Sequence, residues 1–205
     1  MTALVAALVL MQSAPVQLFD GKSLMGWHED VPANDGKAEP VAAFVVRGGV
    51  LVSLGEPRGH LISNSQYENY RLTIEYRFTK AAGNCGVLVH SSIPRARGNM
   101  LPRSLEVQMM SGNGGDFYQL GETIKKRGAT EPASGIRIAN MTDDSEKPIG
   151  EWNKMVIECK GSDVKVWMNG VFVNDGVECS ASKGQIALQS EGAEVEFRKI
   201  EMAKA

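Results

Sequence analysis

Tyr70-Arg71-Leu72-Thr73-Ile74-Glu75-Tyr76-Arg77-Phe78 carries the strongest local pattern in the chain. Apolar side chains occupy every second position from Tyr70 to Phe78, and charged or polar side chains lie between them. Successive side chains of a β-strand point to opposite faces of its sheet, so this pattern predicts a strand with one buried face.

The chain on either side of this stretch continues with short strands and glycine-containing turns. Asn169-Gly170 separates strands expected over residues 164–168 and 171–173, and this two-residue turn matches the natural twist of a hairpin. Further strands are expected at residues 43–47, 50–53, 86–91, 104–110, 155–159, 185–189 and 194–202. No window after the N-terminal segment shows the apolar spacing of an amphipathic helix. The sequence therefore predicts an all-β fold, a two-sheet antiparallel β-sandwich of the jelly-roll kind.

Length and charge limit the classes of protein that remain. A chain of 205 residues fits one domain, which we expect to cover residues 15–205. The formal net charge is -2, and the dense basic cluster Lys125-Lys126-Arg127 is too short to build a nucleic-acid-binding stripe. Residues 29–41 and 112–150 are expected to be irregular, and the second stretch is a candidate wall of a binding site.

Residues 1–14 resemble a signal peptide. They contain an apolar run over residues 3–11, which is too short to cross a bilayer that needs about 20 residues. We therefore expect a secreted or periplasmic protein without an integral membrane span. The alternative is a buried N-terminal segment.

Three cysteines, Cys85, Cys159 and Cys179, occur without a Cys-x-x-Cys pair. This count signals neither a zinc knuckle nor a redox pair, and the plain expectation is three buried thiols. In an exported protein a disulfide between Cys159 and Cys179 is the alternative.

Two expected strands carry polar side chains on the face opposite to their apolar ones. In residues 104–110, Glu106 and Gln108 alternate with apolar neighbours, so they are expected on the outer face, where a ligand could lie. The same alternation places Asn84 and His90 together on the strand over residues 86–91 and its approach. The alternative for this face is that it is only solvated. His90 could be a base, a metal ligand or a polar residue at a strand end.

Two further regions offer groups that suit a sugar. Gln189 and Glu191 combine an amide with a carboxylate, which together donate to and accept from hydroxyl groups. Trp167 lies between Val166 and Met168 and is expected to point away from the core. It could stack on the apolar face of a sugar or cover a neighbouring loop.

A series of motifs across the chain resembles the 3-keto-disaccharide hydrolase family, also described as 3-keto-glycoside lyase/hydratase domains. The motifs follow in the order of the family: LFDGKSLMGW at 18–27, GNCGV at 83–87 with His90, LEVQ at 105–108, GEWN at 150–153, MNGV at 168–171, IALQSEG at 186–192 and VEFR at 195–198. The resemblance implies a concanavalin A-like jelly roll, which agrees with the strand pattern.

The resemblance also implies a carbohydrate-active enzyme that cleaves or hydrates glycosides oxidised at C3. A ketone at C3 acidifies the C2 hydrogen, so the reaction needs a base, an acid for the leaving oxygen and a donor or cation that stabilises the enolate. Glu106 and His90 are the candidates for proton transfer, and a divalent metal ion is a candidate cofactor, with its ligands unknown. The candidates for contact with the glycoside substrate are Asn84, Gln108, Trp167, Gln189 and Glu191, and Glu191 is also the candidate for a second acid or a metal ligand.

Two other functions are compatible with the same pattern. A non-catalytic carbohydrate-binding module would use the outer sheet face and Trp167 without needing a carboxylate at Glu106. A structural surface protein would neither bind nor convert a sugar.

Overall fold

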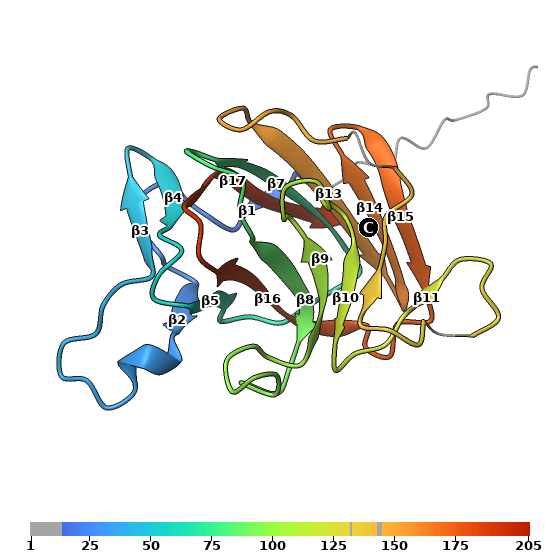
Figure 1. Ribbon diagram of the computed structural model, residues 1–205, viewed down its shortest axis with the longest axis horizontal. Coiled ribbons are helices and arrows are strands. Elements are labelled where there is room, and N and C mark those ends of the chain that lie inside the picture. The colour runs from blue at the N-terminus through green and yellow to red at the C-terminus, as the bar shows by residue number, and fades with distance from the viewer. Residues whose placement is uncertain (1–13, 132, 143–144) are drawn as a thin grey trace, which may run out of the picture.

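The computed structural model describes residues 14–131, 133–142 and 145–205, and it consists of two antiparallel β-sheets packed face to face (Figure 1). The predicted all-β sandwich of the jelly-roll kind is confirmed. Apart from Ala14, the expected signal peptide lies outside the described residues, so export stays a prediction. Within the described part of the chain, no helix is long and apolar enough to cross a membrane.

The first sheet has nine strands and contains the stretch from which the fold was predicted. Its order is β11 (Lys125–Lys126), β15 (Val171–Val177), β14 (Asp163–Met168), β13 (Asn153–Lys160), β7 (Tyr70–Phe78), β17 (Val195–Lys204), β4 (Val50–Ser53) and β3 (Phe44–Arg47), with β1 (Val16–Gln17) also paired to β17.

The second sheet has eight strands and lies in front of the first one in Figure 1. Its order is β12 (Arg137–Ile138), β10 (Phe117–Leu120), β9 (Ser104–Gln108), β8 (Gly86–Ser91), β16 (Lys183–Ser190), β5 (Gly59–Ser63) and β2 (Trp27–Asp30), with β6 (Tyr67–Glu68) paired to the other end of β16. A single turn of 3₁₀-helix, η1 (Pro32–Asn34), follows β2.

The core lies between the two sheets and follows from the alternation in the sequence. Leu72, Ile74 and Tyr76 of β7 are fully buried, while the residues between them on this strand are partly exposed. They belong to one hydrophobic cluster with Leu105 and Val107 of the second sheet. Burial of apolar surface between two sheets is the main favourable contribution to folding in such a sandwich.

Some strand boundaries differ from the prediction for local reasons. β9 ends at Gln108 rather than at residue 110, and the side-chain Oε1 of Gln108 accepts hydrogen bonds from the backbone N–H groups of Met109 and Met110, each 2.8 Å long. The stretch 112–150 contains the short strands β10, β11 and β12, which are too brief for a periodic signal. β2 and β5 were not predicted.

All three cysteines are buried free thiols, as the sequence predicted. The alternative disulfide between Cys159 and Cys179 is not formed in this structure. Cys85, which directly precedes β8, donates a hydrogen bond to the carbonyl oxygen of Gln189 on β16 at 3.4 Å.

The inward face of β7 gives a first prediction. Leu72→Ala is expected to lower the free energy of unfolding by about 2–5 kcal/mol, because it removes apolar contacts and leaves a cavity in a close-packed core. Thr73→Ala on the outward face of the same strand is expected to change it by about 0.5 kcal/mol or less. Chemical unfolding of the purified variants measures both values, and equal losses would contradict the assigned orientation of β7.

Candidate functional site

The outer face of the second sheet carries a group of polar side chains from neighbouring strands. On β9, Leu105 and Val107 belong to the core, whereas Glu106 and Gln108 point the other way. The predicted division of this strand between two faces is therefore confirmed. Despite its outward direction, Glu106 is only 4% exposed, because side chains and loops on the outer face cover it.

Gly86 has no side chain, so side chains from the two neighbouring strands can approach each other above it. It lies on β8 opposite Gln108, between the strands that carry Glu106 and Gln189. A β-carbon on Gly86 would overlap Glu106 Oε1 and would lie 2.8 Å from Gln189 Oε1. Gly86 does not have a positive φ, so its role is to leave space rather than to permit an unusual backbone.

The environment of Glu106 favours its protonated form. Burial and the nearby carboxyl group of Glu191 raise the pKa of Glu106 to about 8, while a hydrogen bond with the side chain of Gln189 acts in the opposite direction. Burial disfavours the charged form of a carboxyl group, and a second carboxylate adds repulsion. Glu106 is therefore a carboxylic acid at neutral pH.

Glu191 lies at the end of the same face, near Arg58, which forms an ion pair with Glu56 at 3.3 Å. Ser190 pairs with Gly59, and Arg58 precedes β5 on the side of Glu191. Burial raises the pKa of Glu191, and the charge of Arg58 opposes this effect. The two carboxyl groups thus differ in their surroundings. The charge of Arg58 acts on the pKa of Glu191 but is not among the causes that shift the pKa of Glu106.

His60 is a member of this face that sequence analysis missed. It lies on β5 directly opposite Gln189 on one side and Asp30 of β2 on the other, and it is 1% exposed. Its Nε2 is 3.7 Å from Asp30 Oδ2, and Arg95 holds the other oxygen of Asp30 at 2.6 Å. Burial lowers the pKa of His60 to about 4, so the ring is neutral at pH 7.

The signals that could have identified His60 and Arg58 were weak. In Arg58-Gly59-His60-Leu61-Ile62 polar and apolar residues do alternate in part, but the segment is short and follows a proline. Only the pairing of β5 with β16 shows that both residues share a face with Gln189.

Three polar atoms on this face are buried without a hydrogen-bond partner among the described residues. They are His60 Nδ1, Asn84 Oδ1 and Gln189 Oε1. Asn84 precedes β8 and pairs with Gly192, which places it beside Glu191. Oxygen atoms and unprotonated ring nitrogens accept hydrogen bonds, so a ligand with several hydroxyl groups suits this set.

Gln108 shares the face, but its oxygen is already used. Its Oε1 accepts the two backbone N–H groups that follow β9. The side chain therefore shapes the end of the strand, and only its amide nitrogen is left for a ligand.

The expected position of His90 was wrong. His90 has a positive φ of 55°, and β8 and β16 shift register near this end of the pair. The ring lies between the sheets, edge-on to Tyr70 with 6.5 Å between ring centroids, and its Nδ1 is 3.9 Å from Cys179 Sγ. Because the backbone turns at this residue, His90 does not follow Gly86 and Leu88 to the outer face.

Trp167 was also expected near the other candidates, and this placement was wrong. It does point away from the core, but it lies on β14 in the first sheet, whose outer face is on the opposite side of the sandwich. The guanidinium of Arg71 lies 4.6 Å from its ring centroid, and Phe172 lies 5.1 Å away. Trp167 thus packs with its neighbours and does not join Glu106.

The candidate metal ion finds no matching set of ligands. Among the residues that the structure describes, no three His, Cys, Asp or Glu side chains are grouped so that they could hold a metal ion. The donor set of this face is one of amides, two carboxyl groups and a buried imidazole.

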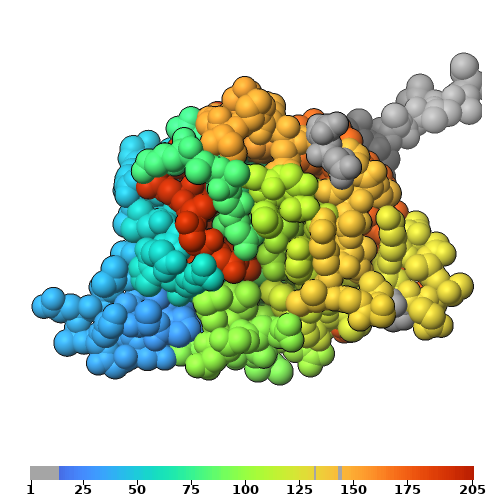
Figure 2. Space-filling model, in the orientation of Figure 1, coloured from blue at the N-terminus to red at the C-terminus, as the bar shows by residue number. Residues whose placement is uncertain are grey.

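Loops border the polar face on two sides. Leu101, in the loop between β8 and β9, packs on Leu88 and Ile62, which form an apolar row beside Glu106. A cleft of about 390 Å³ lies between three loops and is lined by Pro32, Ala33, Glu56, Pro57, Arg58, Gly98, Asn99 and Met100. In Figure 2 the red C-terminal part of the chain reaches the surface of the molecule between the cyan and the green parts.

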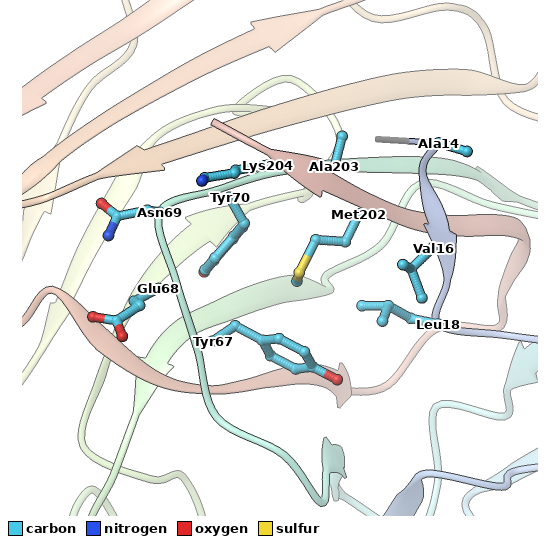
Figure 3. A pocket seen from close by; sticks show the side chains of 10 residues that line it. All are labelled: Ala14, Val16, Leu18, Tyr67, Glu68, Asn69, Tyr70, Met202, Ala203 and Lys204. Atoms are coloured by element: carbon cyan, nitrogen blue, oxygen red, sulfur yellow. The ribbon is translucent and has the colours of Figure 1, made fainter. Parts of the chain in front are cut away.

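A second hollow lies elsewhere and has a different character. It measures about 490 Å³ and lies beside β1, β6 and the end of β17 (Figure 3). Val16, Leu18, Tyr67 and Met202 line it, so it is mainly apolar, and β6 pairs with the end of β16 away from Gln189.

The chain matches one protein family over nearly its whole described length. The family model is described as a 3-keto-alpha-glucoside-1,2-lyase-like domain, and it matches residues 14–203. No curated protein matches the chain at a significant level.

Solved structures with the same fold come from carbohydrate-related proteins. Two candidate glycosyl hydrolases from Parabacteroides distasonis are 18% and 21% identical, with TM-scores of 0.67 and 0.65. The first alignment covers 92% of both chains, and the second covers 94% of this chain and all of the other. A carbohydrate-binding module from Bacillus subtilis is 12% identical over 87% of this chain and 96% of its own, with a TM-score of 0.58. At these identities the similarity shows the fold.

The space above Gly86 gives a second prediction. Gly86→Ala is expected to lower the free energy of unfolding by about 1–3 kcal/mol, because the added carbon displaces Glu106 and Gln189. Gly135→Ala is the control, since nothing lies within 4 Å of its would-be β-carbon and its φ is not positive. Thermal and chemical unfolding measure the effect, and an unchanged Gly86→Ala protein would contradict the close approach.

The protonation of Glu106 gives a third prediction. The folded protein keeps this proton up to about pH 8, whereas the unfolded chain releases it near the ordinary value of 4.5. The free energy of unfolding therefore falls with rising pH across this window, by at most about 1.4 kcal/mol per pH unit, and levels off above it. Glu106→Gln should be less sensitive to pH than the wild type. Unfolding curves from pH 5 to 9 provide the measurement, with Glu158→Gln on the first sheet as control.

Proposed function

Because the chain belongs to the 3-keto-alpha-glucoside-1,2-lyase-like domain family, we propose that it cleaves glycosides oxidised at C3 by elimination and that water then adds to the product. One observation carries the proposal. Glu106 is a buried carboxylic acid beside a second carboxyl group, on a sheet face with buried acceptor atoms that have no described protein partner.

The chemistry requires one acid and one base. Removal of the C2 proton gives the enolate of the C3 ketone, and expulsion of the oxygen at C1 then forms a C1–C2 double bond. The leaving oxygen takes up a proton as it departs. Water adds across the double bond, so that C1 gains a hydroxyl group and C2 regains a proton.

The two carboxyl groups fit these two roles. We assign Glu106 as the acid, because burial raises its pKa to about 8 and so keeps its proton at neutral pH. We assign Glu191 as the base: burial raises its pKa too, but the charge of Arg58 opposes this effect and favours the charged form at Glu191 alone of the two. Two nearby carboxyl groups in different surroundings are a common way to obtain an acid and a base from the same residue type.

The remaining polar groups fit the binding of a sugar. Asn84 and Gln189 each present an amide oxygen that lacks a donor among the described residues, and sugar hydroxyl groups supply such donors. No step is assigned to a metal ion, because the described residues do not form a set of ligands. Enolate stabilisation is assigned instead to hydrogen-bond donors, namely Arg58 and the amide nitrogens of the face.

A direct assay tests the proposed reaction. Purified protein incubated with a 3-keto-glucoside or 3-keto-trehalose is expected to release the free sugar. Glu106→Gln should lower kcat/KM by about 10²- to 10⁴-fold, because the amide cannot donate the proton. Wild-type activity should fall above about pH 8, where Glu106 loses its proton.

The matched control is Glu158→Gln, the same substitution on the outer face of the first sheet. It pairs with Arg71 at 2.8 Å and is expected to leave kcat/KM unchanged. Full activity of Glu106→Gln would contradict the assignment of the acid. Sugar binding without turnover over a wide substrate panel would favour the non-catalytic carbohydrate-binding module, and neither binding nor turnover would favour a structural surface protein.

A further inference from the structure

The loop between β8 and β9 runs along the outer face of the second sheet. It leaves β8 after Ser91, which pairs with Gln185 near the start of β16. Residues 98–100 of the loop line the cleft together with Arg58, which directly precedes β5. Because β5 begins opposite the last residue of β16, this part of the loop lies near the other end of β16. Residues 92–103 therefore extend along both β5 and β16.

Leu101 attaches this loop to the middle of the outer face. It packs on an apolar cluster that contains Ile62, Leu88 and Ala187, which lie on β5, β8 and β16. Leu88 and Ala187 are 0% exposed, although they do not belong to the core between the sheets. Side chains on the outer face, Leu101 among them, therefore cover these two residues and keep water from them.

Arg95 attaches the same loop to the edge of the sheet. Its Nε donates a hydrogen bond to Asp30 at 2.8 Å, and its Nη2 donates one to Asp35 at 2.8 Å. A further hydrogen bond joins Nη1 to the second oxygen of Asp35. Asp30 ends β2 directly opposite His60, and Asp35 follows η1. A guanidinium that binds a carboxylate through two nitrogens forms a strong and directional contact, and this one holds the loop beside His60.

The rest of the loop forms its hydrogen bonds within itself. At its base, the N–H of Ser92 donates to the carbonyl oxygen of Arg103 at 3.0 Å, and further along Arg97 and Leu101 exchange two backbone bonds of 3.0 Å. Among the described residues, no backbone group of residues 94–101 bonds to another element of the fold. Most side chains of the loop are exposed. A segment with few contacts to the body of a protein opens at a low cost in free energy, so this loop can move as one unit.

We propose that residues 92–103 are a lid, that Arg95 with its two carboxylate partners is the latch of this lid, and that the lid opens to admit a ligand to the polar face. With the lid closed, His60 and Gln189 are each 1% exposed, so a ligand reaches them only after their cover has moved. Closure over a site excludes water from it. The inference rests on the proposed function only for the nature of the ligand, a sugar.

The three histidines of the chain provide a test in the wild-type protein without any ligand. His28 is exposed on β2, His60 lies beside the latch, and His90 lies between the sheets with 0% exposure. Diethyl pyrocarbonate, a neutral reagent, modifies unprotonated imidazoles, and mass spectrometry of peptides gives the rate at each position. We expect the rate at His60 to lie between a fast His28 and a slow His90. A rate as slow as that of His90 would show that the lid does not open by itself, and a rate as fast as that of His28 would show that it does not cover His60.

Removal of the latch is the second test. Arg95→Gln is expected to raise the rate at His60 about 3- to 10-fold, because the loss of a partly exposed ion pair favours the open lid. High salt should raise the wild-type rate as well, since it screens the ion pairs, and should have little effect on Arg95→Gln. The matched control is Arg97→Gln in the same loop, where the side chain is exposed and has no ion pair with a described residue. Equal rates at His60 in the wild type and in Arg95→Gln would overturn the latch.

A second reporter under the lid separates opening from a change in the charge near His60. Ala187→Cys places a thiol beneath Leu101, and the three native thiols, which are buried between the sheets, serve as the internal reference. With iodoacetamide, a neutral reagent, the new thiol should react faster than the native ones, and the addition of Arg95→Gln should raise its rate as at His60. A new thiol as slow as the native ones would refute the lid.

Unfolding midpoints of all variants are measured in parallel, and the histidine measurements need no substitution at Ala187. A loss of global stability would raise the rates at His90 and at the native thiols as well, whereas opening of the lid leaves them unchanged. None of these experiments uses a sugar. A failure of the sugar assay would therefore refute the proposed function and leave the result on the lid separate.

Discussion

The packing of β9 against the opposite sheet is the constraint on which the candidate site depends. Leu105 and Val107 are fully buried in the hydrophobic cluster between the sheets. A strand cannot rotate one residue without turning all its neighbours, so the burial of these two side chains forces Glu106 to the outer face. The burial of Leu105 and Val107 thus fixes the direction of the ionisable side chain between them.

The charge state of that group depends on what covers it. Glu106 lies under neighbouring side chains, and the removal of water disfavours its ionised form. Glu191 adds to this effect, while the charge of Arg58 opposes the effect of burial at Glu191 and is not among the causes that shift Glu106. Unequal surroundings separate two residues of the same type into an acid and a base. The absence of a side chain at Gly86 is part of this arrangement, because it allows Gln189 to approach Glu106.

The outer faces of the two sheets differ in a way that composition does not reveal. On the first sheet, Arg71 forms an ion pair with Glu158 and stacks on Trp167, so these charged and aromatic side chains interact with one another. On the second sheet, Asn84 and Gln189 keep buried oxygens without a described partner. Buried polar atoms are usually hydrogen-bonded, and exceptions tend to mark sites of function. Asp175 Oδ1 on β15 of the first sheet is also buried without a described partner, so the second sheet is distinguished by several such atoms near two carboxyl groups.

The pattern of residues along the chain was enough to predict the fold class and the direction of side chains within single strands. Alternation in β7 and β9 predicted the buried face of Leu72 and the outward face of Glu106, because a period of two is a local property of an extended chain. It could not show which strands are neighbours. His60 and Arg58 join the site only through the pairing of β5 with β16, and Trp167 leaves it because β14 belongs to the other sheet. His90 departs because its backbone has a positive φ, which alternation does not report. Long-range pairing and local breaks in the strand were decided by the tertiary structure, since both depend on contacts between residues far apart in the chain.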